Sequence, residues 1–513
     1  MELYFNRENL SHVRNILNTS ITQEETMEMI VPDSLPDILR IICVDTTILI
    51  RGKDADTGRV SVSGIASATV IYAPDGAEGV RKINAEIPFT ISAAESEITS
   101  ASKLIARVSA VTADASVINP RKFVLRTDIR AELSCYNEAE LAIASDVDAA
   151  DDSVEFLRES RSICIPVDVR EKSFVIADEI ALPGGTPEIG DILSTRAAVT
   201  VEESKIVGNK VIFRGSANIA LLYIPADDSD LRNVDLISEF SQIMELENIS
   251  EECNFDIILM LTGVYVDAGG IGISDNRSAN VELHAVAQCI AAENKTISFI
   301  SDVYSTRHAI EQIAENVEFE HREPPIKSTT LFREIIDGHP GDVSRVIAVS
   351  ATTGAADAAI DDGSLTMKAP IHVTCIYAAE DGRIQSLIKR FETDAQLGAR
   401  HGSAYLVSAA IGGEVQGAVT GEGIEIKVPV EFNVTETALL SINLLSEVSL
   451  DEESVIDTSA KPSLIIAKTV KDDTFWKLAK RHFSTPALIL SANDLDIEDG
   501  IVEGQMLIIP KKR

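Results

Sequence analysis

The side chains that could perform catalysis or hold a metal ion are widely separated in this sequence. Eight histidines occur, and no two of them stand four residues apart, the spacing that places two ligands on one face of a helix. Six cysteines occur without a close pair, so reduced thiols in an apolar core are favoured over a zinc site or a disulfide framework. We therefore expect no catalytic residue, no metal site and no cofactor.

Two short motifs carry reactive or glycine-rich residues without the context that their chemistry needs. Gly269-Gly270-Ile271-Gly272 is not followed by a helical pattern, so a turn is favoured over a nucleotide-binding loop. His401-Gly402-Ser403 contains a hydroxyl nucleophile but lacks the strand–turn–helix pattern of a nucleophile elbow. A Ser-His-Asp triad assembled from distant residues stays open as an alternative.

Residues 463–513 contain the side chains best placed to bind a ligand. The apolar run 465–470 predicts a strand, and the oxygens of residues 472–474 supply a helix N-cap. A second helix is expected to begin near Pro486, and the apolar residues 506–509 predict a closing strand. The predicted order is strand, helix, helix, strand, with Trp476, the only tryptophan of the chain, in the core.

This segment resembles the LysM family over Lys468 to Pro510. The matching landmarks are the sequence DTFWKLA from Asp473, the asparagine at 493 and the sequence IVEGQMLIIP from Ile501. The resemblance implies a βααβ fold and a shallow groove that in many members holds N-acetylglucosamine chains, whereas some members bind proteins. The family usually has glycine where this chain has Asp472, and an aromatic residue where it has Lys468.

The resemblance places a candidate binding surface on the loops before the first helix and after the second. Its residues are Asp472, Asp473, Thr474, Phe475, Asn493, Leu495, Asp496 and Ile501. Phe475, Leu495 and Ile501 are the expected apolar anchors for a protein ligand. A plain N-cap role for Thr474 and a C-cap role for Asn493 remain equal alternatives.

Charge divides the chain into two unequal parts. The net charge is −36, which disfavours general binding to nucleic acid or to an acidic membrane. From Pro462 onward, eight Lys and Arg face seven Asp and Glu, so the preceding residues carry about −37. Lys477, Lys480 and Arg481 could dock an acidic partner, or form a solvated face. The N-terminus lacks a basic-then-apolar export signal, and no apolar stretch is long enough to span a membrane.

The residues before 443 show a threefold repeat. Each copy has an alternating strand that ends at a tyrosine, namely Tyr72, Tyr223 and Tyr377. Each strand follows a Pro/Gly turn with an aspartate (Asp37, Asp191 and Asp342) and precedes a phenylalanine (Phe89, Phe240 and Phe391). Alternation of Val, Ile and Thr predicts antiparallel β-sandwiches or split barrels, with the tyrosine ring in the core and its hydroxyl at a rim.

The repeats resemble the SPOCS domain of endospore-forming bacteria. The resemblance rests on PDSLPDILRI at 32–41, Asn119-Pro120-Arg121-Lys122, the echo Asn276-Arg277 and DVYST at 302–306. Tandem SPOCS repeats followed by one LysM domain resemble the SipL-like family of spore coat morphogenetic proteins. A mainly β chain is therefore expected, with sandwich or barrel-like repeats and a small βααβ domain at the C-terminus.

The predicted organisation has seven parts. They are an N-terminal lead-in (1–27), SPOCS-like repeat 1 (28–137), an acidic connector (138–162), repeat 2 (163–292), repeat 3 (293–442), an acidic flexible linker (443–462) and the LysM domain (463–513). The connector is a candidate for a helix, and the linker is expected to let the LysM domain swing free.

Two functions follow from the resemblance. The first is a non-catalytic assembly protein of the spore coat, in the mother-cell cytoplasm at the forespore surface, whose LysM module binds a SpoIVA-like ATPase of the coat basement layer. The alternative is a peptidoglycan-binding anchor to cell wall or cortex, which rests on the LysM fold alone.

Overall fold

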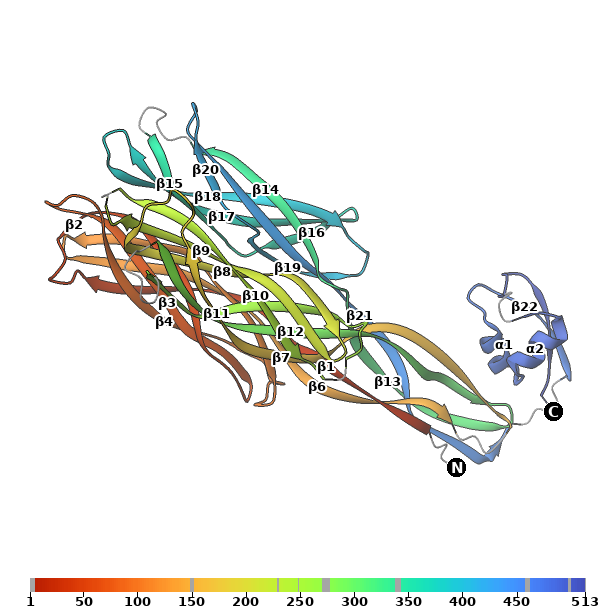
Figure 1. Cartoon of the computed structure of the whole chain (residues 1–513). Helices are drawn as coiled ribbons and strands as arrows, with labels where there is room; N and C mark the ends of the chain where they lie inside the picture. The colour runs from red at the N-terminus through yellow and green to blue at the C-terminus, as the bar shows by residue number, and fades with distance from the viewer. Residues whose placement is uncertain are drawn as a thin grey trace.

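A computed structural model describes residues 5–147, 152–227, 230–247, 249–269, 277–336, 343–456, 462–496 and 500–512. The described chain is almost entirely antiparallel β-structure, and its two helices lie in the C-terminal module, residues 463–512. This confirms the mainly β fold class. Figure 1 shows a broad body of packed sheets that narrows into a long stalk, with the C-terminal module beyond the stalk. Asn276 and Asp342, two residues of the repeat pattern, fall outside the described residues.

The first repeat is a sandwich of two three-stranded sheets. One sheet has the order β2-β3-β4 and the other β1-β6-β5. The strands are β1 (Phe5–Ile30), β2 (Ile38–Asp56), β3 (Arg59–Pro74), β4 (Arg81–Ala94), β5 (Lys103–Asn119) and β6 (Lys122–Val147). Side chains alternate between buried and partly exposed along β3, so one face of each sheet enters a shared core.

The second and third repeats have the same arrangement. The second consists of β7 (Val154–Ala181), β8 (Ile189–Val207), β9 (Lys210–Pro225), β10 (Arg232–Glu245), β11 (Asn254–Ala268) and β12 (Ser278–Ser305). The third consists of β13 (His308–Arg322), β14 (Ile326–Ile336), β15 (Val343–Thr353), β16 (Asp357–Asp361), β17 (Ser364–Ala379), β18 (Ile384–Gly398), β19 (Ala404–Ile411), β20 (Gln416–Val419) and β21 (Ile424–Val455). Each repeat has its own apolar core.

The third repeat differs because its first strand is broken. β13 and β14 both pair with β21, as the single strands β1 and β7 pair with β6 and β12. Pro324 and Pro325 stand between β13 and β14. Proline has no backbone N–H to donate to the ladder, which accounts for the interruption at this point.

The three sandwiches share an apolar cluster at their mutual junction. In β2 the pairing register with β3 shifts between Ile41 and Cys43, which leaves Ile42 as an extra, bulged residue. The same shift occurs at Leu193 in β8 and at Ile347 in β15. All three bulged residues pack in this cluster, outside the cores of their own sandwiches. At a bulge, the side chain leaves the alternating in-and-out pattern of its strand and points in a new direction. One bulge in each repeat therefore directs an apolar side chain into the cluster that joins the three repeats.

The stalk consists of the ends of six long strands, paired as β1 with β6, β7 with β12 and β13 with β21 (Figure 1). Two apolar clusters fill the space between these ribbons, and each cluster takes residues from all three repeats. The chain passes from one repeat to the next at the stalk tip, since β6 and β12 end there and β7 and β13 begin there.

The stalk corrects two expectations about the segments between repeats. Residues 138–147 and 154–162, expected in an acidic connector, belong to the long strands β6 and β7. Residues 443–455, expected in a flexible linker, continue β21. Their composition suggested a helix in the connector and solvated coil in the linker, but in a narrow ribbon one strand face is solvated while the other packs against neighbouring ribbons. The domain boundaries themselves stay a prediction.

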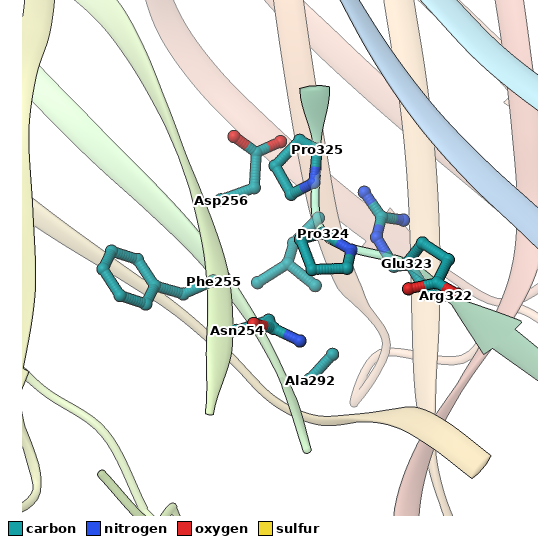
Figure 2. Close-up of a pocket in the computed structure, with 9 residues that line it drawn as sticks. Asn254, Phe255, Asp256, Ala292, Arg322, Glu323, Pro324 and Pro325 are labelled. Carbon is teal, nitrogen blue, oxygen red and sulfur yellow. The ribbon is translucent and has the colours of Figure 1, made fainter. Parts of the chain in front are cut away.

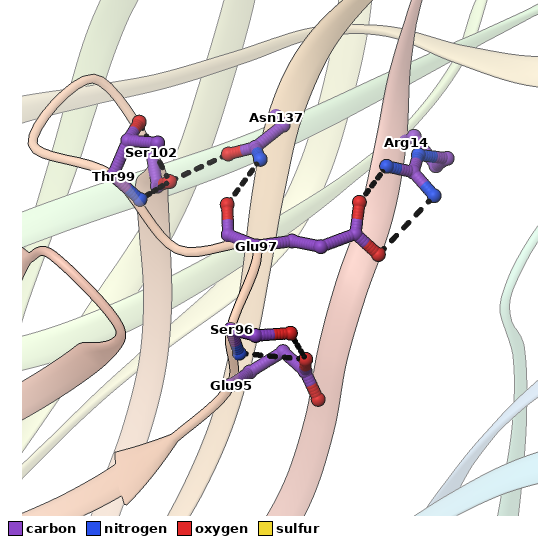
Figure 3. Close-up of polar contacts among 7 residues, drawn as sticks. All are labelled: Arg14, Glu95, Ser96, Glu97, Thr99, Ser102 and Asn137. Carbon is purple, nitrogen blue, oxygen red and sulfur yellow. Dashed lines mark hydrogen bonds and ion pairs between the residues drawn. The ribbon is translucent and has the colours of Figure 1, made fainter.

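A polar network fastens the loop between β4 and β5 to the stalk side of the first repeat. Arg14 on β1 forms an ion pair with Glu97, and Asn137 on β6 donates a hydrogen bond to the Glu97 carbonyl oxygen over 2.8 Å. Ser102 in turn donates to the Asn137 side-chain oxygen at 2.5 Å, as Figure 3 shows. The loop is therefore held against β1 and β6 by side-chain contacts, although it forms no strand itself.

The C-terminal module has the predicted order of strand, helix, helix and strand. Its elements are β22 (Leu464–Lys468), α1 (Phe475–His482), α2 (Pro486–Asn493) and β23 (Met506–Pro510). β22 and β23 pair antiparallel, and both helices pack on one face of this two-stranded sheet. Thr474 is the N-cap of α1 and Pro486 lies at the start of α2, so the sequence signals for both helix starts are confirmed.

Candidate functional site

The loop before α1 is held by two of the candidate site residues. The Thr474 hydroxyl accepts a hydrogen bond from the Lys477 amide at 3.1 Å, as an N-cap does. The Asp473 carboxylate accepts from the Val470 amide and from the Arg481 guanidinium, both at 2.9 Å. The bond from Val470, together with the charge of Arg481, keeps the pKa of the Asp473 carboxyl below its ordinary range. These polar atoms stabilise the loop.

Asn493 connects the second helix to the closing strand. Its side-chain amide donates to the carbonyl oxygens of Ile489 and Ile508, each at 2.7 Å. Its side-chain oxygen accepts from the Ile508 amide, also at 2.7 Å. The C-cap of α2 is Asp494, with φ 52°, and not Asn493. The Asn493 side chain is therefore engaged in a brace within the fold, a role that the sequence pattern did not distinguish from capping.

The remaining candidate residues flank these two loops. Asp472 is exposed and has φ 66°, a left-handed conformation that explains why the LysM pattern usually has glycine there. Phe475 is buried in the module core, whereas Leu495 and Ile501 pack partly against it. Asp496 is exposed on the loop after α2. The two loops are linked through Thr469, whose hydroxyl donates to the Val502 carbonyl oxygen at 2.6 Å.

The module exposes apolar side chains along one side of its sheet, which we call the apolar face. Its residues are Leu464 and Ile466 on β22, Met506 on β23, and Val470 and Val502 just beyond these strands. Their exposed fractions run from 50% for Leu464 to 68% for Val502. Exposed apolar side chains gathered on one face indicate a surface for association with another molecule.

Trp476 does not lie in the module core as predicted. The core comprises Phe475, Leu478, Ala479, Ile489, Leu507 and Ile509, and Trp476 packs partly against its edge. Its indole N–H donates to the carboxylate of Asp302 on β12 over 2.8 Å. Spacing alone placed Trp476 on the helix but could not show that its indole leaves the module to contact the stalk.

In the first two repeats, an arginine and a tyrosine hold the Pro-rich turn that opens the repeat. Arg121 donates to the carbonyl oxygen of Leu35 at 2.8 Å and to the carboxylate of Asp37 at 3.1 Å. The Tyr72 hydroxyl donates to the Pro36 carbonyl oxygen at 3.0 Å, and its ring is fully buried. This confirms the core position of the repeated tyrosine and gives Asp37 a structural partner.

The second repeat copies this turn clamp. Arg277 donates to the Thr186 carbonyl oxygen at 3.3 Å, and Tyr223 donates to the Pro187 carbonyl oxygen at 3.1 Å. Asp191 instead accepts from Lys82 of the first repeat at 2.9 Å, so it contributes to the contact between repeats. Arg277 and Tyr223 therefore hold the turn of the second repeat as Arg121 and Tyr72 hold that of the first, whereas Asp191 does not take part.

A small cavity lies between the second and the third repeat. It measures about 10 Å³ and lies between β11, β12 and the break after β13, lined by Asn254, Phe255, Arg322 and Pro325 among others (Figure 2). This is room for about one water molecule and none for a sugar or nucleotide. Within the described residues, no cluster of His, Cys, Asp or Glu could hold a metal ion. No described helix is long and apolar enough to cross a membrane.

Comparison with known families agrees with this arrangement. The family model for the SipL, SPOCS domain matches residues 37–117 and 188–268, and the LysM domain model matches residues 468–510. A search of the curated proteins and a search of the solved structures each found no match. The third sandwich lies outside both SPOCS matches.

Fold and site together define a repeat protein built from domains of the binding type. Its architecture is tandem SipL SPOCS domains followed by a C-terminal LysM domain. These domains indicate a spore-associated protein that carries a module of the peptidoglycan-binding kind.

Proposed function

We propose that this chain is a non-catalytic assembly protein of the spore coat. It acts in the mother-cell cytoplasm at the forespore surface, where its LysM module binds a coat basement-layer protein of the SpoIVA-like kind. The tandem SPOCS and LysM architecture supports a role in sporulation. We further propose that the third sandwich is a SPOCS-like repeat, because it has the strand arrangement and the inter-repeat bulge of the first two.

The apolar face of the LysM module is the observation that favours a protein ligand over a glycan. Five exposed apolar side chains occur there, and removing exposed apolar surface from water favours association with another protein. The polar candidates Asp473, Thr474 and Asn493 are already engaged inside the module. A glycan would need polar groups that are free to exchange hydrogen bonds with its hydroxyls.

The aromatic side chains of the module point to the same choice. Phe475 is buried, Phe483 is half-buried at the end of α1, and Trp476 is engaged with the stalk. None of the three is fully exposed as a platform for a sugar ring. The alternative, an anchor on peptidoglycan, is favoured by the LysM match itself and by the exposed Asp472 and Asp496.

Binding by the full chain tests the proposal. Purified wild type and Val470→Asp/Val502→Asp are assayed against a purified SpoIVA-like coat protein and against insoluble peptidoglycan. The proposal predicts saturable binding to the coat protein that the double variant loses, without sedimentation on peptidoglycan. Equal binding by the double variant would remove the apolar face from the site. Leu331→Asp, which also replaces an exposed aliphatic residue but on β14, is the matched control.

A further inference from the structure

The stalk tip and helix α1 form an interface within the chain. The Asp302 carboxylate accepts hydrogen bonds from the Trp476 indole at 2.8 Å and from the Lys480 ammonium at 2.6 Å. Trp476 and Lys480 are four residues apart, so they lie on one face of α1. Asp302 also accepts from Gln312 on β13 at 3.2 Å, which fixes its carboxylate against the neighbouring ribbon.

Two further contacts surround this centre. The ring of Tyr304 meets that of Trp476 edge to face, with centroids 4.8 Å apart, and its hydroxyl donates to the Ser484 carbonyl oxygen at 2.7 Å. Tyr304 is 5% exposed and packs with the module core although it belongs to β12. At the edge, Lys512 pairs with Glu155 on β7 at 2.8 Å. Aromatic, hydrogen-bonding and ionic contacts thus coincide on one patch.

We infer that the LysM module is docked on the stalk tip by the Trp476–Lys480 face of α1, with Asp302 and Tyr304 as its seat. The partner of this basic face is therefore the acidic stalk of the same chain. This inference concerns a different face from the apolar face, and it holds whichever ligand the module binds.

The three stalk ribbons show why the seat lies on the second repeat. Each ribbon has a β-bulge at a serine that precedes an acidic residue and a valine: Ser145-Asp146-Val147, Ser301-Asp302-Val303 and Ser446-Glu447-Val448. In each, the serine hydroxyl donates to a carbonyl oxygen of the opposite strand, at 3.3, 3.4 and 3.2 Å. The three acidic residues are therefore structurally equivalent.

Only the second ribbon adds an aromatic residue to this pattern. Tyr304 follows Val303, whereas Asp148 follows Val147 and Ser449 follows Val448. A tyrosine supplies both a ring for the indole and a hydroxyl for the Ser484 carbonyl oxygen. The seat thus uses a bulge common to all three repeats and a side chain that one repeat has.

The short tether favours docking within one chain over docking between chains. The backbone amide of Ile456 donates a hydrogen bond to the Arg307 carbonyl oxygen at the stalk tip, and the module begins at Ser463. The residues between them span at most about 25 Å. A tether of this length gives the module an effective concentration of about millimolar at the tip, so even a weak interface stays formed.

Fluorescence of Trp476, the only tryptophan of the chain, tests the docking in the full-length protein. Asp302→Ala removes the carboxylate of the seat, and Lys480→Ala removes one of the two α1 side chains that donate to it. We expect both to shift the emission to longer wavelength and to increase quenching by acrylamide. Small-angle scattering should show a larger maximum dimension, because the released module moves away from the stalk.

Matched controls separate docking from folding. Lys477→Ala removes a lysine of α1 whose ammonium bonds to the Asp472 carbonyl oxygen within the module and not to the stalk, and Glu447→Gln changes the equivalent acidic residue of the third ribbon. Both should keep the wild-type emission, quenching and dimensions. Unchanged emission in Asp302→Ala and Lys480→Ala would overturn the inference. Docking that depends on protein concentration would also overturn it, since that result assigns the seat to the module of a second copy.

Discussion

The side chain of Asn493 on α2 forms two hydrogen bonds with the backbone of Ile508 on β23, one to its amide and one to its carbonyl oxygen, both 2.7 Å long. This pair fastens the second helix to the closing strand. Both N–H groups of the Asn493 side chain and one lone pair of its oxygen are engaged in bonds within the module. Asn493 is thus a structural residue that borders the candidate site.

Asn493→Ala should destabilise the module. Two backbone groups of Ile508 would lose their partners, at a cost to the free energy of unfolding of about 1–3 kcal/mol. Thermal unfolding of the full chain followed by Trp476 fluorescence measures the change. Asp472→Asn, at an exposed position of the loop before α1 whose positive φ asparagine also adopts, is the control and should unfold like the wild type. Equal stability of Asn493→Ala and wild type would argue against the brace.

Docking of the module should weaken in acid. Burial alone would raise the pKa of the Asp302 carboxyl, but hydrogen bonds from Lys480 and Trp476, the charge of Lys480 and a bond from Gln312 outweigh it and lower the pKa below 3.8. Because the docked pKa is depressed, this stabilisation is complete above pH 3.8 and is lost as the pH falls through the docked pKa.

The emission of Trp476 as a function of pH measures this transition. The wild type should keep its emission at neutral pH and shift to longer wavelength only in acid. Asp302→Asn should remove that transition, because the amide does not titrate. A wild-type transition near neutral pH would contradict the assignment to Asp302.

The bulged residues at the junction of the repeats should contribute strongly to stability. Ile42→Ala removes a side chain that is 3% exposed, and similar truncations cost about 2–5 kcal/mol. Leu39→Ala, a bulged residue of the same strand that is 65% exposed, is the control and should cost little. Chemical denaturation of the full chain compares the two. Similar losses for both variants would show that the junction cluster does not hold the repeats together.

Gly215, inside strand β9, should not tolerate a residue with a side chain. A Cβ at Gly215 would lie 1.9 Å from the Thr200 carbonyl oxygen and 2.9 Å from the ring of Phe240, the residue that pairs with it across the sheet. Gly215→Ala should therefore lower the melting temperature of the second repeat. Gly398→Ala, which meets nothing within 4 Å, should not, and an unchanged melting temperature for Gly215→Ala would refute the close packing.

Local periodicity was sufficient to predict much of the fold. The spacing of Phe475 and Leu478 gave α1, and the oxygens before it gave the N-cap at Thr474. Alternation along β3 gave a half-buried strand, with Tyr72 in the core. In these elements, each side chain is placed by its neighbours in sequence, which is the information that a single sequence contains.

Long-range relationships could not be predicted in this way. Ile42 looks like an ordinary strand residue, because nothing local shows that a bulge redirects it. Trp476 and Asp302 are 174 residues apart, so neither one indicates the other. Residues 138–147 have an acidic, alanine-rich composition that suggested a helix, and only their pairing with β1 makes them a strand. The groove residues of the LysM module stay a prediction that binding must test.

Binding of the full-length chain to its two candidate ligands tests the proposed function most directly. The wild type and Val470→Asp/Val502→Asp are titrated with a purified SpoIVA-like coat protein and, in parallel, sedimented with insoluble peptidoglycan. The account predicts saturable binding of the wild type to the coat protein, loss of that binding in the double variant, and no sedimentation of either protein. Sedimentation of both proteins with peptidoglycan, competed by N-acetylglucosamine oligomers and without binding to the coat protein, would contradict it.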